Sequence, residues 1–292
     1  MKNLNEDTIT QAVLARHCEA SDPRLRDVMT CLVQHLPSFA REIKLTEDEW
    51  FAGVEFLTAV GHITDDKRQE FILLSDVLGL SMLVTALNNR KPRGCTEATV
   101  LGPFHVEGAP SYAQDSDISN GASGEPFFVC GRVLSLDGSP VPGAELQVWQ
   151  ADAEGMYDVQ YPGDAGHRAR GVLHADADGR FSFKTVRPAS YPIPHDGPVG
   201  HLLKALGRHP WRPAHLHFLV SAPGHQRLIT HLFRNGDTYL DSDAVFGVRG
   251  SLVCEWLRHP PGRMPDGATS TSPYYSLSFD FVLNPLATAS SR

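Results

Sequence analysis

The sequence lacks the features that mark several large classes of protein. No apolar run reaches the roughly 18 residues that a membrane-spanning helix needs. The first 20 residues alternate polar and apolar positions, without the apolar core of a signal peptide. No basic stretch is long enough for a nucleic-acid groove, and the formal net charge is -8. We therefore expect no membrane span, no nucleic-acid partner and a cytoplasmic location.

Cysteine is scarce and scattered. The five cysteines are Cys18, Cys31, Cys95, Cys130 and Cys254, and no two lie close in sequence. An odd, dispersed set without an export signal indicates reduced thiols, and it lacks the paired spacing of a disulfide framework or a zinc ribbon. The rest of the composition, with 41% hydrophobic and 21% charged residues among 292, is that of a globular protein with one large and one smaller domain, or with two ordinary domains.

The first third of the chain has the periodicity of helices. Asp22 can cap a helix that begins at the following proline, and Thr46 with Glu49 forms a capping box ahead of a second helix. A third helix is expected from about residue 66 to residue 87. Together these helices carry more apolar surface than they can bury alone. We expect them to pack on the second domain, on another subunit, or on both.

The pattern changes after residues 88–94, where polar residues, proline and glycine end the helical periodicity. The spacing of the short strands that follow favours an antiparallel sandwich over βαβ units, and Asp178-Gly179 signals a hairpin turn. The expected strands are 127–134, 144–150, 172–175, 181–186, 214–221, 227–233 and 275–283. The sequence thus predicts a mainly β protein, with a helical domain at residues 1–94 and an antiparallel β-sandwich catalytic domain at residues 95–292.

The run Arg212-Pro213-Ala214-His215-Leu216-His217-Phe218 is the richest in chemical information. Two histidines two residues apart on a strand project from one face. Imidazoles so placed can reach one metal ion. For the pair alone, a metal site and a hydrogen-bonded polar pocket both remain open. Arg212 is close enough to act on whatever a metal would bind.

Two tyrosines extend this pattern, although each alone would be an ordinary packing residue. Tyr157 and Tyr191 precede the histidines in the order Tyr, Tyr, His-x-His, with Arg212 three residues before the first histidine. From Thr96 onward the chain resembles the intradiol ring-cleaving dioxygenases, and the helical first third resembles the dimerising segment of their catechol-type branch. The matching motifs are Leu101-Gly102-Pro103-Phe104, Gly155-Met156-Tyr157, Tyr191-Pro192-Ile193-Pro194 and the Arg212 to His217 run.

The resemblance implies a non-haem ferric iron, Fe(3+), with Tyr157, Tyr191, His215 and His217 as its ligands. Phenolates are hard anionic donors that favour Fe(3+), and a trivalent cation can remove a phenol proton that normally leaves at about pH 10. Two tyrosinates and a hydroxide balance the charge of the ion, which avoids burying an uncompensated charge. By the same resemblance, an aromatic diol displaces Tyr191, Arg212 offsets charge on the activated ring, and O₂ cleaves the ring between its hydroxylated carbons.

Other residues indicate which ring is cleaved. His231 stands sixteen residues after His215, where catechol-cleaving enzymes usually carry glutamine. Residues 73–76 and 236–248 resemble the branch that cleaves hydroxyquinol, 1,2,4-trihydroxybenzene, to 3-hydroxymuconate, the tautomer of maleylacetate. Asp76, beside Leu73, is either an acceptor for the third hydroxyl or a solvated helix carboxylate. His231 hydrogen-bonds the oxygen species or buttresses Arg212. By family analogy the apolar pocket walls are Val100, Gly102, Pro103, Phe104, Ile193, Pro194 and Val245.

Alternatives remain at the level of sequence. The chain could be a catechol or chlorocatechol 1,2-dioxygenase, and zinc or copper in a hydrolase would also use histidine ligands. Residues 141–149 resemble a segment of adhesive sandwich domains, which leaves a non-catalytic binding module open. The family resemblance implies a homodimer through the N-terminal helices. In related enzymes an amphipathic lipid, such as a phospholipid, lies between the paired helices.

Overall fold

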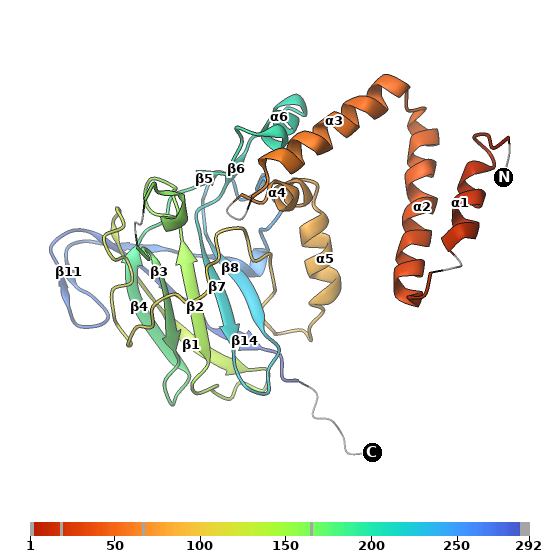
Figure 1. Ribbon diagram of the computed structural model, residues 1–292. Coiled ribbons are helices and arrows are strands. Elements are labelled where there is room, and N and C mark those ends of the chain that lie inside the picture. Colours follow the sequence, from red (N-terminus) through yellow and green to blue (C-terminus); the bar gives the residue numbers. More distant parts are fainter. Residues whose placement is uncertain (1–2, 18–19, 66–67, 164–165, 287–292) are drawn as a thin grey trace, which may run out of the picture. The chain divides into compact units, whose positions relative to one another are not determined.

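A computed structural model describes residues 3–17, 20–65, 68–163 and 166–286. The chain forms two compact units, Met1–His62 and Ile63–Arg292. The first is helical and the second is rich in β-sheet (Figure 1).

The helical unit contains α1 (Ile9–His17), α2 (Pro23–Ile43) and α3 (Glu47–Ile63). The predicted caps are confirmed. The Asp22 side chain accepts hydrogen bonds from the first backbone N–H groups of α2. Glu49 accepts from the Thr46 N–H at 2.9 Å, and Thr46 Oγ1 accepts from the Glu49 N–H at 3.3 Å. Helix α1 was not predicted, and it packs against α2, where Arg41 Nη2 donates to Thr10 Oγ1 at 2.8 Å.

The helix expected from residue 66 to residue 87 is two helices, so this prediction is wrong. Its expected first residue, Asp66, lies outside the described residues. Helix α4 (Glu70–Val77) and helix α5 (Leu80–Asn88) meet at an angle of 80°. Gly79, between them, has φ +77°, a left-handed conformation that glycine adopts without steric cost. Apolar periodicity continues across such a break and therefore does not reveal it.

Within the described residues, no single helix has both the length and the apolar character to cross a membrane. Helices α4 and α5, which are bent relative to each other, have sufficient length and apolar composition for a membrane span only when the two are taken together.

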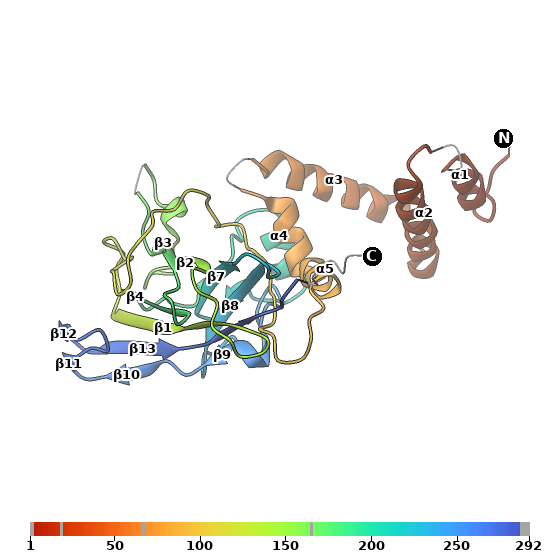
Figure 2. The same ribbon diagram turned by 90° about the horizontal axis from the view of Figure 1, so that it is seen from below.

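The sheet-rich unit contains two five-stranded sheets among the described residues (Figures 1 and 2). The first sheet has the order β3 (Arg170–His174), β2 (Glu145–Gln150), β7 (His215–Ser221), β8 (Leu228–Arg234), β9 (Val253–Cys254). The second has the order β10 (Leu257–His259), β13 (Tyr274–Ser278), β1 (Pro126–Ser135), β14 (Phe281–Leu283), with β4 (Arg180–Val186) also paired to β1. Smaller elements are β5 (Tyr191–Pro192) with β6 (Trp211–Arg212), β11 (Gly262–Arg263) with β12 (Thr269–Ser270), α6 (Pro198–Ala205), and the 3-10 turns η1 (Asp158–Gln160) and η2 (Gly250–Leu252).

Both sheets are mixed, which corrects the expected antiparallel arrangement. Strand β1 pairs in parallel with β13 and β14, and β8 pairs in parallel with β9. The strand expected at residues 275–283 is divided into β13 and β14. At the division the Phe279 carbonyl oxygen lies 1.8 Å from the point where Gly131 would carry a Cβ, so only glycine fits there. A close backbone approach of this kind interrupts a strand without changing its apolar pattern.

The hairpin expected around Asp178-Gly179 is also wrong, because β3 and β4 enter different sheets. The tight turn exists: the Gly179 N–H donates to the Asp176 carbonyl at 3.0 Å. However, β3 pairs with β2 and β4 pairs with β1. The sequence reveals the turn, whereas partner choice depends on strands that are distant in sequence.

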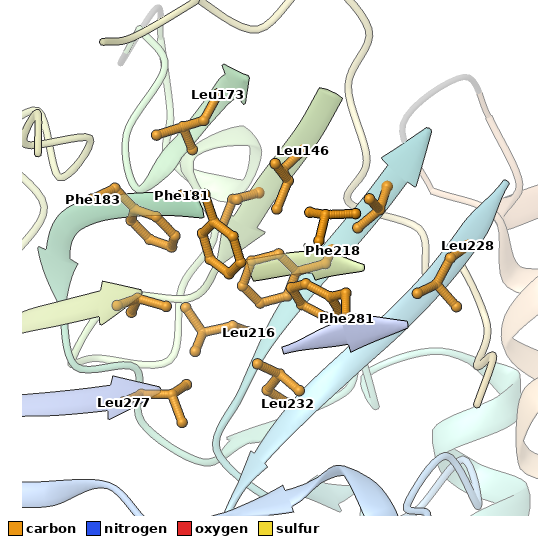
Figure 3. Close-up of a cluster of buried hydrophobic side chains, with 14 of the residues drawn as sticks. Leu146, Leu173, Phe181, Phe183, Leu216, Phe218, Leu228, Leu232, Leu277 and Phe281 are labelled. Atoms are coloured by element: carbon orange, nitrogen blue, oxygen red, sulfur yellow. The ribbon is translucent and has the colours of Figure 1, made fainter. Parts of the chain in front are cut away.

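One hydrophobic cluster joins buried side chains of both sheets (Figure 3). Phe181, Phe218 and Phe281 meet near its middle, with the Phe218 and Phe281 ring centroids 4.8 Å apart. Leu216 and Phe218 of β7 point into this cluster. Because side chains alternate along a strand, His215 and His217 are placed on the opposite face of the same sheet.

Candidate metal centre

Four donor atoms from three segments of the sheet-rich unit converge. Strand β7 supplies His215 and His217, β5 supplies Tyr191, and Tyr157 precedes η1. Tyr157 Oη lies 3.3 Å from Tyr191 Oη, 3.5 Å from His215 Nε2 and 2.9 Å from His217 Nε2. The two Nε2 atoms are 3.1 Å apart. All four residues are buried.

These separations fit donors that share one metal ion. Nitrogen and oxygen ligands lie about 2.0–2.1 Å from a metal ion, so neighbouring donors are separated by about 2.8–3.4 Å. Three of the four observed separations, 2.9, 3.1 and 3.3 Å, fall in that range, and the fourth, 3.5 Å, lies just above it. Two phenols with two imidazoles suit a hard trivalent cation better than a soft one. The residues therefore fit the ferric ion that the sequence analysis expects.

Hydrogen bonding fixes the tautomer of one histidine. His215 Nδ1 lies 2.7 Å from the carbonyl oxygen of Pro213. A carbonyl oxygen can only accept, so Nδ1 carries the proton and Nε2 keeps a free lone pair facing the other donors. Metal-binding histidines commonly have such a carbonyl partner on the other ring nitrogen.

Burial sets the charge of the donors in the metal-free protein. It lowers the pKa of His215 and of His217 well below their ordinary value, so both imidazoles are neutral and able to bind a metal. Burial, together with neighbouring Tyr191, raises the pKa of Tyr157 well above its ordinary value. The Tyr157 phenol therefore keeps its proton until a cation replaces it.

Two glycines permit the close packing of the donor residues. Gly155 has φ +79°, and a Cβ there would lie 2.8 Å from Tyr191 Cβ. Gly102 has φ +76°, and its Cβ would lie 3.0 Å from His217 Cε1. Phe104 stacks on the Tyr157 ring, with centroids 4.3 Å apart. Larger residues at either glycine would push a donor out of place.

Arg212 is buried beside the donors, with one edge of its guanidinium group facing them. Arg212 Nη1 lies 3.4 Å from Tyr191 Oη and 3.3 Å from His215 Nε2. The other edge faces Asp243, with Nε 3.0 Å from Oδ1 and Nη2 3.4 Å from Oδ2. Burial alone would lower the pKa of Arg212. The charges of Asp243 and Tyr191 outweigh this effect, so the pKa lies above its ordinary value. A permanent cation is therefore fixed at the donor cluster.

Sequence reasoning missed Asp243. It is buried, and it also accepts the backbone N–H groups of Val245 at 3.3 Å and Gly247 at 2.9 Å. A buried arginine needs a carboxylate partner, so the sequence implied some acidic residue. It did not show which one, because Asp243 lies 31 positions from Arg212.

His231 lies beside His217, its register partner on β8. Ring nitrogens of His215, His217 and His231 lie within 4.8 Å of one another, so three imidazoles form a second conceivable metal set. The set that contains the tyrosines is tighter, and His231 Nδ1 is already hydrogen-bonded to Thr99 Oγ1. Within the described part of the chain, the buried His231 Nε2 has no hydrogen-bond partner. This arrangement favours His231 as a neighbour of the metal ligands and not as a ligand itself.

Most of the expected pocket residues are buried, and the exceptions are the two prolines and Gly102, which is half-buried. Asp76 of α4 is 5% exposed and interacts electrostatically with Arg212 and Asp243. Gly102 and Phe104 contact the donor residues. Pro103 is exposed and Pro194 is half-buried. The remaining expected wall residues are buried, namely Leu73, Val100, Ile193 and Val245.

Comparisons with known proteins agree with this site. A family profile described as "Dioxygenase" matches residues 100–285, and one described as "Catechol dioxygenase N terminus" matches residues 22–96. A 6-chlorohydroxyquinol 1,2-dioxygenase of Cupriavidus pinatubonensis is 58% identical, covering 98% of this chain and 99% of its own. A hydroxyquinol 1,2-dioxygenase of Nocardioides simplex is 50% identical, covering 96% of each chain. The solved hydroxyquinol 1,2-dioxygenase of Pseudomonas putida matches with a TM-score of 0.90 and 46% identity, covering 96% of this chain and 99% of that one.

Proposed function

The chain belongs to the intradiol ring-cleavage dioxygenases, and we propose that it cleaves hydroxyquinol with O₂ to 3-hydroxy-cis,cis-muconate, the tautomer of maleylacetate. The observation that carries this proposal is the convergence of two tyrosines and two histidines on one point, with a buried guanidinium edge beside them. A non-catalytic binding module would have no use for this set. Relatives that act on hydroxyquinols support the choice of ring.

In this proposal Tyr157, Tyr191, His215 and His217 hold ferric iron. The bound iron would withdraw electrons from the aromatic ring and so make it reactive towards O₂. Tyr191 Oη would receive a proton from a substrate hydroxyl, and Arg212 Nη1, 3.4 Å away, would keep that region positive. Because Arg212 remains protonated, it would stabilise negative charge on the ring oxygen without moving a proton. Asp243 would keep the guanidinium edge turned towards the substrate.

The third hydroxyl group would be recognised by Asp76. This carboxylate is buried, and its charge interacts with that of Arg212. The Asp76 carboxylate is already hydrogen-bonded to Ser81. A further hydrogen bond from a substrate hydroxyl would discriminate against a ring that lacks this hydroxyl, because such a ring forms one hydrogen bond fewer with the carboxylate. Catechol lacks that hydroxyl, so we infer a preference for hydroxyquinol.

The test is oxygen uptake by iron-replete protein, with hydroxyquinol and catechol measured side by side. We expect kcat/KM for hydroxyquinol to exceed that for catechol, and the ferric protein to be wine red because tyrosinate transfers charge to Fe(3+). Equal or greater kcat/KM for catechol would instead support a catechol or chlorocatechol 1,2-dioxygenase. Colourless protein that resists ferric loading would reject the ferric centre altogether.

A chlorinated ring is a second candidate substrate. The relative that is 58% identical over nearly the whole chain is a 6-chlorohydroxyquinol 1,2-dioxygenase. We therefore include 6-chlorohydroxyquinol among the proposed substrates. The same oxygen-uptake assay tests it, and a kcat/KM below that for catechol would remove it.

Three further proposals concern the domains, the oligomeric state and the location of the protein. We propose a functional division between a helical domain at residues 1–94 and a β-sandwich catalytic domain at residues 95–292, and the family profiles, which meet between residues 96 and 100, support it. We also propose a homodimer through the N-terminal helices, with a phospholipid between them. The cysteines that the structure describes, Cys31, Cys95, Cys130 and Cys254, are free, in keeping with a reducing cytoplasm.

A further inference from the structure

One row of paired residues crosses the first sheet at the donor cluster. Arg170 on β3 is the register partner of Trp149 on β2, which in turn pairs with His217 on β7. Cross-strand partners project from the same face of a sheet. The Trp149 and His217 rings are stacked, with centroids 4.8 Å apart and an angle of 17°. Arg170 therefore lies two strands away from a proposed ligand and on its face.

Arg170 does not contact a donor atom, but it forms an ion pair with the residue that follows Tyr157 in the sequence. Its Nε lies 2.8 Å from Asp158 Oδ2, and its Nη2 lies 2.5 Å from Asp158 Oδ1. The side chains of Arg170 and Asp158 are 2% and 3% exposed. Asp158 comes directly after Tyr157. A two-bond arginine–carboxylate pair fixes orientation as well as distance.

The short turn after Tyr157 is anchored at several further points. Asp158 also accepts the backbone N–H of Val159 at 2.9 Å and of Arg168 at 3.2 Å. The Tyr157 N–H donates to Gln160 Oε1 at 2.9 Å. The segment that carries Tyr191 is held differently: Ser190 Oγ donates to Asp237 Oδ2 at 2.6 Å. The Tyr157 segment is thus tied to the sheet by a buried ion pair that includes the residue directly after the ligand.

We propose that the Asp158–Arg170 ion pair is a positioning device for Tyr157, which keeps the phenol oxygen within the donor set in both the metal-free and the metal-bound protein. Arg170 and Asp158 are positioning residues here, since neither touches the four donor atoms. The inference rests on the proposed function, because it takes Tyr157 as a ligand of ferric iron. A purely structural pair would stabilise the fold and leave the ligand geometry unchanged.

The experiment compares ferric-loaded variants by visible absorbance per bound iron, iron retention and thermal unfolding. The variants are Arg170→Met, Arg170→Lys and Asp158→Asn, with Tyr157→Phe as the reference for a lost ligand. Arg180→Met is the matched control, because its pair with Asp178 is 65% and 67% exposed. Outer partners of metal ligands typically contribute about 10–100-fold to metal affinity.

We expect Arg170→Met to lose iron about 10–100-fold more readily than wild type, with a charge-transfer band moved towards that of Tyr157→Phe. Arg170→Lys, which keeps the charge but not the two-bond geometry, should recover part of the wild-type band. Arg180→Met should match wild type throughout. If Arg170→Met does not fold, Arg170→Lys and Asp158→Asn provide the same comparison.

Two outcomes separate the inference from the proposed function. If wild-type protein is coloured and the folded variants at positions 158 and 170 keep its band and iron affinity, the ion pair only stabilises the fold and the inference is overturned. If wild-type protein shows no ferric charge-transfer band, the proposed function fails, and the inference fails with it.

Discussion

The helical unit and the two sheets of the second unit distribute their apolar residues in opposite ways. The sheet-rich unit buries Phe127, Phe181, Phe218 and other large side chains completely or nearly so. In the described part of the helical unit, Val60 is the one buried residue. Helices α2 and α3 instead expose ten large apolar side chains: Leu25, Val28, Leu32, Leu36, Phe39, Ile43, Trp50, Phe51, Val54 and Leu57.

This difference shows where each unit obtains its stability. Burial of apolar surface stabilises the sheet-rich unit from within, at about 25 cal/mol per Å². The helical unit exposes an apolar surface that water solvates poorly, and contiguous surfaces of this kind mark interaction sites. The candidate metal centre therefore lies on sheets that have their own hydrophobic core, whereas the apolar surface of α2 and α3 is where the proposed homodimer would form.

The largest expected effect is on the sheet core. Phe218→Ala should lower the free energy of unfolding by about 3–5 kcal/mol, since it removes a buried ring and leaves a cavity. Phe39→Ala on α2, where Phe39 is 55% exposed, should change it by less than about 0.5 kcal/mol in dilute protein. Urea denaturation measures both. A comparable loss in the two variants would mean that the helical unit has an internal core of its own.

The next effect is catalytic and should leave the scaffold in place. Arg212→Ala should retain iron and the visible band while kcat falls about 100–1000-fold, because the fixed positive charge beside the substrate is lost. Oxygen uptake and iron analysis measure the two properties. The control is Arg132→Ala, since Arg132 pairs with Asp280 on the surface. Full turnover by Arg212→Ala would assign this arginine a structural role only.

A third prediction concerns the exposed apolar surface of the helices. Phe39→Glu should raise the dissociation constant of the proposed homodimer at least about 30-fold, because the charge enters the interface once from each subunit. Sedimentation velocity measures this shift. Leu136→Glu is the matched control, since Leu136 is an exposed leucine of the sheet-rich unit. An unchanged dimer in Phe39→Glu, or a monomeric wild type, contradicts the proposed interface.

The sequence predicts local features of both units and few of their long-range pairings. Asp22 and Thr46 act within their own helix turns, so short-range patterns were sufficient to identify them. Alternation along β7 likewise predicts that His215 and His217 share a face. By contrast, the break at Gly79 depends on one backbone conformation that leaves the apolar pattern intact.

Long-range partners leave no local signal. Nothing near Asp178-Gly179 indicates that β3 and β4 belong to different sheets, because that choice depends on β1 and β2. The same reason explains why Asp243, the partner of Arg212, was not predicted. The histidines of the candidate site were found from their spacing on a strand, and the tyrosines through family motifs. Spacing alone could not show that three segments so distant in sequence meet.

The smallest expected effect is at Asp76, where stability and substrate choice should move in opposite directions. Burial raises the pKa of Asp76 above its ordinary 3.8, although a hydrogen bond with Ser81 and the charge of Arg212 partly oppose the shift. A carboxyl group with a raised folded-state pKa contributes stability that is present below the unfolded value and is lost as the pH rises through the folded value. Asp76→Asn is neutral at every pH. Its unfolding free energy relative to wild type should therefore increase as the pH rises from the unfolded-state pKa through the raised folded-state pKa, and stay constant above it.

Activity should show the opposite sign. Asp76→Asn should lower kcat/KM for hydroxyquinol about 10–100-fold, because a charged acceptor for the third hydroxyl is lost, while kcat/KM for catechol changes little. Asp178→Asn, on the exposed turn between β3 and β4, should leave kcat/KM for both substrates unchanged. A parallel loss for hydroxyquinol and catechol would show that Asp76 supports Arg212 and does not recognise the third hydroxyl. Selective loss for hydroxyquinol would place the substrate preference on α4, outside both sheets.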